Sequence, residues 1–273
     1  MKIGFIGAGN MGGAILKGAL NKGFLKPEEC MVSDRNTALL STFQQEYGIT
    51  CINDNPKLVQ NCEWIVLAIK PVFFMDVLDE IKPYLSKQHK LISIAAGLSV
   101  EMINAVIGET GASLLRVMPN TPAMVGAGVT ALCEETTLTS DEMVWAKALF
   151  ETLGMVQIIP ERLIDAVIAV SGSSPAYVYM FIEAMADAAV KLGMFRPMAI
   201  ETAAQAVMGA AKMVLETHQH PAVLKDQVCS PGGTTIEAVH MLEKGGFRAA
   251  VIDAMEACAN KNIAMTQQSG VKK

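Results

Sequence analysis

Apolar and polar residues alternate with two different periods along the first half of the chain. Short β-branched runs predict strands at residues 2–6, 31–33, 64–69, 90–95 and 114–117. Amphipathic stretches between them predict helices at residues 11–22, 37–47, 73–85 and 100–107. Further strands are expected at 129–132 and 155–159, and between them a helix that starts with a capping box of Thr139 and Glu142 and ends at Gly154. This order predicts βαβ units and a mostly parallel sheet.

After Pro160 the strand pattern stops, and long helical patterns rich in Ala and Met take its place. They cover residues 163–170, 176–192, 198–217, 236–243 and 247–265. We therefore expect an α/β domain with a mostly parallel sheet over residues 1–160, followed by an all-α domain over residues 161–273.

The helix expected at 176–192 carries its charges on one narrow stripe. Glu183, Asp187 and Lys191 are spaced four residues apart, and the rest of the helix surface is apolar. Such a helix must be buried almost all round, and about a hundred helical residues are few to bury it. We expect a second copy of the chain to cover it as a homodimer, with packing against the first domain as the alternative.

The composition indicates a protein with a large core and a small-molecule ligand. Of its 273 residues 51% are hydrophobic, the formal net charge is -5, and no Lys/Arg cluster occurs. These values argue against nucleic acid or an anionic membrane surface as a partner. We expect no membrane span and no export signal, because the apolar runs are short or broken. The six scattered cysteines are typical of small buried residues in a cytoplasmic protein.

A glycine fingerprint, Gly7-Ala8-Gly9-Asn10-Met11-Gly12, lies between the first predicted strand and the first predicted helix. Gly7 would make the tight turn, Gly9 would let the backbone approach a pyrophosphate, and Gly12 would allow close packing of helix on strand. The second predicted strand leads to Asp34 at the expected spacing. These features together predict a Rossmann-like site for a nicotinamide or flavin dinucleotide.

Asp34 and Arg35 indicate opposite cofactor preferences. Asp34 would suit the ribose hydroxyls of NAD, whereas Arg35 could stack on adenine and pair with the 2′-phosphate of NADP. Arg35 could equally be a solvated surface charge. The preference between the two cofactors stays open at this point.

A second glycine-rich segment, Ser230-Pro231-Gly232-Gly233-Thr234-Thr235, leads into the helical pattern that starts at Ile236. Its glycines would let a ligand approach the backbone closely, and Thr234 with Glu237 predicts a capping box. The free amides at the start of the helix predict an anion site that would fit a small carboxylate.

Neither a metal site nor a hydrolytic triad is predicted. The four histidines have no metal-ligand spacing, and His218 with His220 before Pro221 is typical of a helix end. No nucleophile elbow or Ser-His-Asp order is visible. Reduction of an imine needs only an orienting hydroxyl, because the nitrogen can already carry the proton.

Six segments together resemble the pyrroline-5-carboxylate reductase family, and they occur in the family's order. They are residues 5–11, 68–71, 94–97, 118–122, 171–177 and 230–235. The resemblance implies the last step of proline biosynthesis, in which hydride passes from the nicotinamide to the imine carbon of L-1-pyrroline-5-carboxylate to give L-proline. It also implies a Rossmann-like domain and a helical dimerisation domain that interleaves with a partner, often as dimers assembled into larger rings.

The resemblance further implies roles for individual residues. The pyrophosphate would be held by Ile6, Gly7, Ala8, Gly9, Asn10 and Met11, with Gly12 behind them. The adenosine and ribose side would be lined by Asn55, Ala68, Ile69, Lys70 and Pro71, and the nicotinamide side by Ile94, Ala95 and Ala96. The substrate carboxylate would meet Ser230, Gly232, Gly233 and Thr234, with the Thr235 hydroxyl near the ring nitrogen as the catalytic group.

Two points of the resemblance are left open. Glu161 either helps the substrate pocket or serves the helix dipole of its first turn. Family members usually accept NADPH through a small hydroxyl residue and a basic residue, and this chain has Ser33 but places Asp34 at the contacting position. NADP(H) is therefore expected, with NAD(H) as a second possibility.

Two other functions compete with the imine reductase. A β-hydroxyacid or 6-phosphogluconate-type dehydrogenase has the same two-part layout but needs a catalytic lysine on a helix of the second domain, for which Lys191 and Lys212 are the candidates. A protein that binds the cofactor without turnover would have no use for a carboxylate-binding loop.

Overall fold

The computed structural model describes residues 3–271, and contacts between residues divide it into two compact units. The first unit contains the residues up to Gly172 together with those from Cys258 onward, and the second contains Ser173–Ala257. The division at residue 160 stays a prediction about sequence domains. Residues 161–172 pack with the first unit because Ile164 and Ile168 share a buried cluster with Met118 and Ile159.

The first unit is built on one eight-stranded sheet in the order β3-β2-β1-β4-β5-β6-β7-β8. Every neighbouring pair is parallel except β6 with β7, which confirms the predicted mostly parallel sheet. The strands are β1 (Ile3–Ile6), β2 (Cys30–Ser33), β3 (Thr50–Ile52), β4 (Trp64–Leu67), β5 (Lys90–Ser93), β6 (Ser113–Met118), β7 (Gly128–Cys133) and β8 (Gly154–Ile159).

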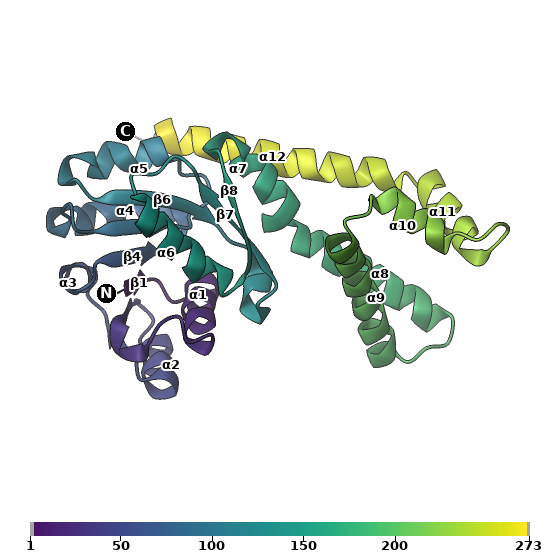
Figure 1. The fold of residues 1–273 in the computed structure, drawn as a ribbon, viewed down its shortest axis with the longest axis horizontal. Coiled ribbons are helices and arrows are strands. Elements are labelled where there is room, and N and C mark those ends of the chain that lie inside the picture. Colours follow the sequence, from purple (N-terminus) through teal and green to yellow (C-terminus); the bar gives the residue numbers. More distant parts are fainter. Residues whose placement is uncertain (1–2, 272–273) are drawn as a thin grey trace. The chain divides into compact units, whose positions relative to one another are not determined.

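Helices cover both faces of this sheet (Figure 1). Alternate residues along a strand point to opposite faces, so Trp64 packs with one group of helices and Ile65 with the other. The first group is α1 (Asn10–Asn21), α2 (Thr37–Tyr47) and α6 (Ser140–Glu151). The second group is α3 (Asn55–Asn61), α4 (Pro71–Ile81) and α5 (Val100–Ile107).

The structure confirms the long elements and adds short ones that the sequence pattern did not predict. The additions are β3, α3 and, in the second unit, α10 (Pro221–Val228). The three-residue strand β3 is too short to show a period, and α3 and α10 are short and contain few apolar residues. The helix expected to end at Gly154 ends at Glu151, and Gly154 instead begins β8 with φ 140°.

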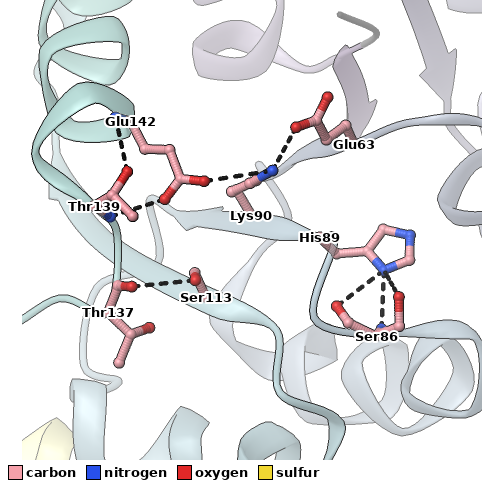
Figure 2. A network of polar contacts seen from close by, with 8 residues as sticks. All are labelled: Glu63, Ser86, His89, Lys90, Ser113, Thr137, Thr139 and Glu142. Carbon is pink, nitrogen blue, oxygen red and sulfur yellow. Dashed lines mark hydrogen bonds and ion pairs between the residues drawn. The ribbon is translucent and has the colours of Figure 1, made fainter.

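The predicted capping box at the start of α6 is present and belongs to a larger polar network (Figure 2). The Thr139 amide donates to Glu142 Oε2 at 2.8 Å, and the Glu142 amide donates to Thr139 Oγ1 at 3.3 Å. Lys90 at the start of β5 pairs with Glu63 and lies 3.4 Å from Glu142 Oε1. These contacts of Lys90 join the starts of β4, β5 and α6. Near them, the His89 ring lies 3.2 Å from the Ser86 hydroxyl.

Three cysteines, Cys30, Cys62 and Cys133, are buried, which agrees with their interpretation as small apolar residues. Burial raises the pKa of the Cys30 and Cys133 thiols to about 12. Both thiols therefore stay protonated at neutral pH, as expected of core residues.

The second unit is helical, as predicted. It contains α8 (Ser174–Lys191), α9 (Arg196–Thr217), α10, α11 (Thr234–Lys244) and the first part of α12 (Phe247–Val271). His218 ends α9 in the left-handed conformation and His220 caps α10, which confirms that this pair marks helix ends. Before α8, the helix expected at 163–170 is divided into α7 (Ile164–Val167) and a π-helical turn, Ile168–Gly172.

The apolar surface of α8 is not buried within the single chain, which leaves it open to the expected cover by a second copy. Tyr179 is 60% and Met180 69% exposed, whereas only Ala186 of this helix is buried. Among the described residues, one helical stretch, Glu161–Lys191, is long and apolar enough to cross a membrane by length and composition alone. A helix covered by a protein partner has the same composition, so this stretch by itself is weak evidence for a membrane span.

Candidate dinucleotide site

The glycine fingerprint forms the turn between β1 and α1, where two glycines leave no room for a side chain. A Cβ on Gly7, whose φ is +92°, would lie 2.5 Å from the Ala68 carbonyl oxygen. A Cβ on Gly12 would lie 2.3 Å from the Gly7 carbonyl oxygen and 2.8 Å from Ala68 Cβ. The roles predicted for Gly7 and Gly12 in turn and packing therefore follow from these contacts.

Gly9 differs from the other two glycines because it faces open space. A Cβ built on it meets nothing within 4 Å, and it caps α1 without a side-chain hydrogen bond. The amides in the first turn of α1, at Asn10 and Met11, belong to a helix start with no side-chain acceptor. This is the geometry expected of an anion site for a pyrophosphate.

A pocket of about 260 Å³ lies beside this turn, at the carboxyl ends of β1, β2 and β4. It brings together most of the residues predicted for the cofactor. Its lining is Ile6, Gly7, Gly9, Ser33, Asp34, Arg35, Asn55, Ala68, Ile69, Lys70, Phe73 and Val77. Ligands of open parallel sheets bind at this end of the strands, beside the point where the strand order reverses.

The other residues predicted for the cofactor do not line this pocket. Ala8 and Asn10 line an adjoining cavity of about 710 Å³, which shares Gly9 with the first. Pro71 is the first residue of α4. Ile94, Ala95 and Ala96 follow the end of β5, and Ala95 is 2% exposed.

Polar side chains beside the end of β2 form a chain of hydrogen bonds at the pocket. The buried Ser33 hydroxyl donates to Asn55 Oδ1 at 2.7 Å, and Asn55 Nδ2 donates to Glu80 Oε2 at 2.9 Å. The Arg35 guanidinium lies over the Phe73 ring, 5.6 Å from its centroid. Arg35 is itself exposed at the edge of the pocket, so this contact is compatible both with cofactor binding and with a solvated surface charge.

Sequence reasoning missed Phe73, Val77 and Glu80 in this region. Phe73 is 45% exposed in the first turn of α4, directly after the predicted segment 68–71. An exposed aromatic residue at the start of a helix that borders a nucleotide pocket is the signal that could have found it. No comparable signal marks Glu80, because its role depends on a tertiary contact with Asn55.

Glu161 joins the start of α5 to β6. Its Oε1 accepts hydrogen bonds from Arg116 Nη1 at 2.6 Å and from the Val100 amide at 2.8 Å. The Arg116 side chain is 2% exposed, so this ion pair is largely removed from water. Among the described residues, Arg116 Nε and Nη2 have no hydrogen-bond partner, which makes Glu161 the main compensation for a buried charge.

The predicted substrate loop lies in the second unit, before α11. Gly232 has φ +67°, the Gly233 amide donates to the Ser230 carbonyl oxygen at 3.0 Å, and a Cβ on Gly233 would lie 2.5 Å from Ser230 Oγ. The turn therefore favours glycine at Gly232 through its positive φ, whereas a Cβ on Gly233 would mainly displace the Ser230 hydroxyl, which can rotate.

The capping box predicted for Thr234 and Glu237 is wrong. The helix begins two residues earlier than the apolar pattern indicated, so Gly233 is the N-cap, and no side chain caps it. Thr234 and Thr235 already have helical geometry in the first turn of α11. The backbone amides of this turn are consequently left without a side-chain acceptor, which agrees with the predicted anion site.

Other kinds of site find no support in the part of the chain that the structure describes. Within residues 3–271, no group of three or more His, Cys, Asp or Glu side chains could hold a metal ion. Lys212, a candidate catalytic lysine of the dehydrogenase alternative, is 67% exposed and pairs with Glu216 one helical turn away at 3.5 Å.

The parallel sheet, the glycine turn and the pocket beside it define a Rossmann-like NAD(P)-binding domain, followed in the chain by a helical domain. Residues 2–97 match the family model described as NADP oxidoreductase coenzyme F420-dependent, and residues 161–265 match the model described as pyrroline-5-carboxylate reductase dimerisation. The chain belongs to the pyrroline-5-carboxylate reductase family.

Individual relatives support this membership over the whole length. The Escherichia coli pyrroline-5-carboxylate reductase is 47% identical over 96% of this chain and 97% of its own. A crystal structure of the Plasmodium falciparum pyrroline carboxylate reductase with NADP bound has a TM-score of 0.88 at 34% identity, covering 97% of this chain and 98% of that one. The Coxiella burnetii enzyme has a TM-score of 0.89 at 35% identity over the same shares. The β-hydroxyacid dehydrogenase alternative is not favoured by these matches.

Proposed function

We propose that the protein is an NAD(P)H-dependent oxidoreductase that reduces L-1-pyrroline-5-carboxylate to L-proline. Hydride from NADPH adds to the imine carbon, and the ring nitrogen ends the step carrying the proton that makes it an amine. The observation that carries this proposal is the glycine turn beside the pocket, in a chain 47% identical to a pyrroline-5-carboxylate reductase. NADP(H) is the expected cofactor, since a relative with 34% identity has NADP bound.

The cofactor would extend from the pocket beside Ser33 and Asn55 to the segment after β5. The amides of Asn10 and Met11 would hold the pyrophosphate, supported by the open space at Gly9. Ala68 to Pro71 would line the ribose side, and Ile94 to Ala96 the nicotinamide side. These roles rest on the resemblance together with the lining of the pocket.

The substrate carboxylate would bind the amides at the start of α11. Ser230, Gly232, Gly233 and Thr234 would shape this site, and the uncapped first turn of α11 supports it. For Glu161 a substrate role stays a prediction, because its Oε1 already accepts hydrogen bonds from Arg116 and Val100.

Thr235 would orient the imine through its hydroxyl. Removing this one aligned donor in Thr235→Val should lower kcat/KM by roughly ten-fold to a thousand-fold. Thr235→Ser, which keeps the hydroxyl, should retain most of the activity. Equal kinetics for the wild type and Thr235→Val would remove Thr235 from the mechanism.

The reaction itself is tested by mixing the purified protein with NADPH and L-1-pyrroline-5-carboxylate and following NADPH absorbance and proline formation. We expect stoichiometric loss of NADPH and gain of proline, and a smaller rate with NADH. If neither cofactor is oxidised although both bind, the proposed reaction is wrong. Lys191→Ala should keep its activity, whereas a catalytic lysine mechanism would lose it.

We also propose that the protein works in the cytoplasm as a homodimer or a larger assembly of dimers, with neither nucleic acid nor membrane as a partner. The match to a dimerisation family model over residues 161–265 and the exposed apolar side chains of α8 support the dimer. The net charge of -5 supports a small-molecule role rather than a nucleic-acid role.

A further inference from the structure

Asp34 directly follows β2, and together with Arg35 it left the preference between NAD and NADP open in the sequence. A carboxylate that selects NAD would present its oxygens to the ribose hydroxyls of the cofactor. In this structure each carboxylate oxygen of Asp34 already accepts a backbone hydrogen bond. Oδ2 accepts from the Ala8 amide at 2.8 Å, and Oδ1 accepts from the Asn36 amide at 2.8 Å.

The bond from Ala8 joins segments that are far apart in the sequence, whereas the bond from Asn36 is local. Ala8 belongs to the glycine turn, and Asn36 caps the start of α2 through its own side chain, which accepts from the Leu39 amide. The neighbouring Gly7 amide donates to the Ser33 carbonyl oxygen at 2.8 Å. Two successive amides of the glycine turn are therefore held by two successive residues at the end of β2.

We infer that Asp34 is a positioning residue that holds the glycine turn for the pyrophosphate of either cofactor. The inference rests on the proposed use of a nicotinamide dinucleotide. Because the pyrophosphate is common to NADH and NADPH, loss of the Asp34 carboxylate is expected to weaken the binding of both.

The test measures the dissociation constants of NADP+ and NAD+ by fluorescence titration, without any imine substrate. For Asp34→Ala we expect both constants to rise by about ten-fold, the effect of losing charge-assisted hydrogen bonds, with their ratio changed less than about three-fold. Asp34→Asn, which has the same shape and keeps one acceptor, should give a smaller rise of the same kind. Arg35→Ala should instead weaken NADP+ alone.

Asp54→Asn is the matched control, because Asp54 is also an Asp that accepts a backbone bond, from the Lys57 amide at 2.8 Å, but it lies outside the pocket lining. It should leave both constants unchanged. Amide hydrogen exchange gives a readout that does not depend on ligand binding: Ala8 and Asn36 should exchange faster in Asp34→Ala than in wild type.

Selective weakening of NAD+ with NADP+ unchanged or tightened would overturn the inference and make Asp34 the selecting carboxylate. Unchanged exchange at Ala8 and Asn36 would also overturn it. A protein that binds both dinucleotides but reduces no imine would contradict the proposed function while leaving these binding constants as a valid test of Asp34.

Discussion

At the scale of single residues, Gly9 and Gly12 belong to one sequence motif but are needed for different reasons. Gly12 is needed for packing, since a Cβ there would overlap the Gly7 carbonyl oxygen and Ala68. Gly9 is unhindered by the protein, so any need for glycine there must come from the ligand. The motif alone predicts both glycines, but only the contacts tell these two causes apart.

Gly9→Ala and Gly12→Ala should therefore fail in different ways. Gly12→Ala should lower the free energy of unfolding by about 1–3 kcal/mol through overpacking and should also weaken NADPH binding. Gly9→Ala should keep the melting temperature of the wild type, because its backbone has φ -62° and its Cβ meets no atom, yet should weaken NADPH binding. Thermal unfolding and NADPH titration of both variants check this, and equal melting temperatures for the two would contradict it.

The sequence predicted residue types well and their partners poorly. Gly7, Gly9 and Gly12 follow from a local motif, and most of the pocket lining follows from the resemblance. Asp34 could not be assigned, because its Oδ2 meets the Ala8 amide only after β1 and β2 have paired. Ser33, Asn55 and Glu80 likewise form one hydrogen-bonded chain only in the folded protein.

At the scale of elements, buried and half-buried charges fix how strands and helices join. Arg116 on β6 is 2% exposed, and its pairing with Glu161 also holds the first amide of α5. The segment before α5 contains Ile94, Ala95 and Ala96, which are proposed for the nicotinamide side. The ion pair therefore connects the core of the sheet to the start of the region matched by the dimerisation model.

Removing the charge of Arg116 or of Glu161 alone should lower the free energy of unfolding more than removing both charges together. Arg116→Met leaves Glu161 without its cation, and Glu161→Gln leaves a buried cation without its anion, so each should lower the free energy of unfolding by about 3–5 kcal/mol. The double variant should be less destabilised than the sum of the two single variants. Denaturant unfolding of all four proteins measures this, and strict additivity would show that the pair is not coupled.

The capping box of α6 gives a pH-dependent prediction. Burial would raise the pKa of Glu142, but hydrogen bonds from Thr139 and the charge of Lys90 outweigh it and lower this pKa below its ordinary value. A carboxyl group whose pKa is lower in the folded state stabilises the protein above its unfolded pKa of about 4.3, and that contribution is lost as pH falls through the folded pKa.

Glu142→Gln keeps the acceptor of the capping box but removes its charge near Lys90 and the helix N-terminus, so it should lower the free energy of unfolding at pH 7 by about 0.5–1 kcal/mol. The difference from wild type should shrink as the pH falls below about 4.3, because a protonated Glu142 is as uncharged as Gln. Glu151→Gln on the same helix is the control, since its exposed pair with Lys147 should matter by a few tenths of a kcal/mol at most. A difference that stays constant over the whole pH range would exclude ionised Glu142 as its source.

At the scale of the whole molecule, the sequence correctly predicted an α/β half and a helical half but not how a single chain would bury its helices. The charge stripe on α8 led to the expectation of burial by a second copy, and the single chain leaves Val178, Tyr179, Met180 and Phe181 of this helix exposed. The first unit has continuous buried clusters on both faces of its sheet, whereas in the second unit only a few alanines of α8 and α9 are buried. These exposed side chains, in a region that matches a dimerisation family model, support the partner surface that the sequence pattern predicts.

A charge placed on this surface should therefore separate the proposed dimer without unfolding the sheet. Met180 on α8 is 69% exposed, and Met180→Glu would put a carboxylate into an interface that must exclude water. We expect its dimer dissociation constant to rise by at least about a hundred-fold, as for an uncompensated buried charge. Val144→Glu is the matched control, because Val144 is 68% exposed but lies on α6 in the first unit. Sedimentation equilibrium should show a monomer for the first variant and a dimer for the second, and a dimer for both would mean that α8 does not face the partner.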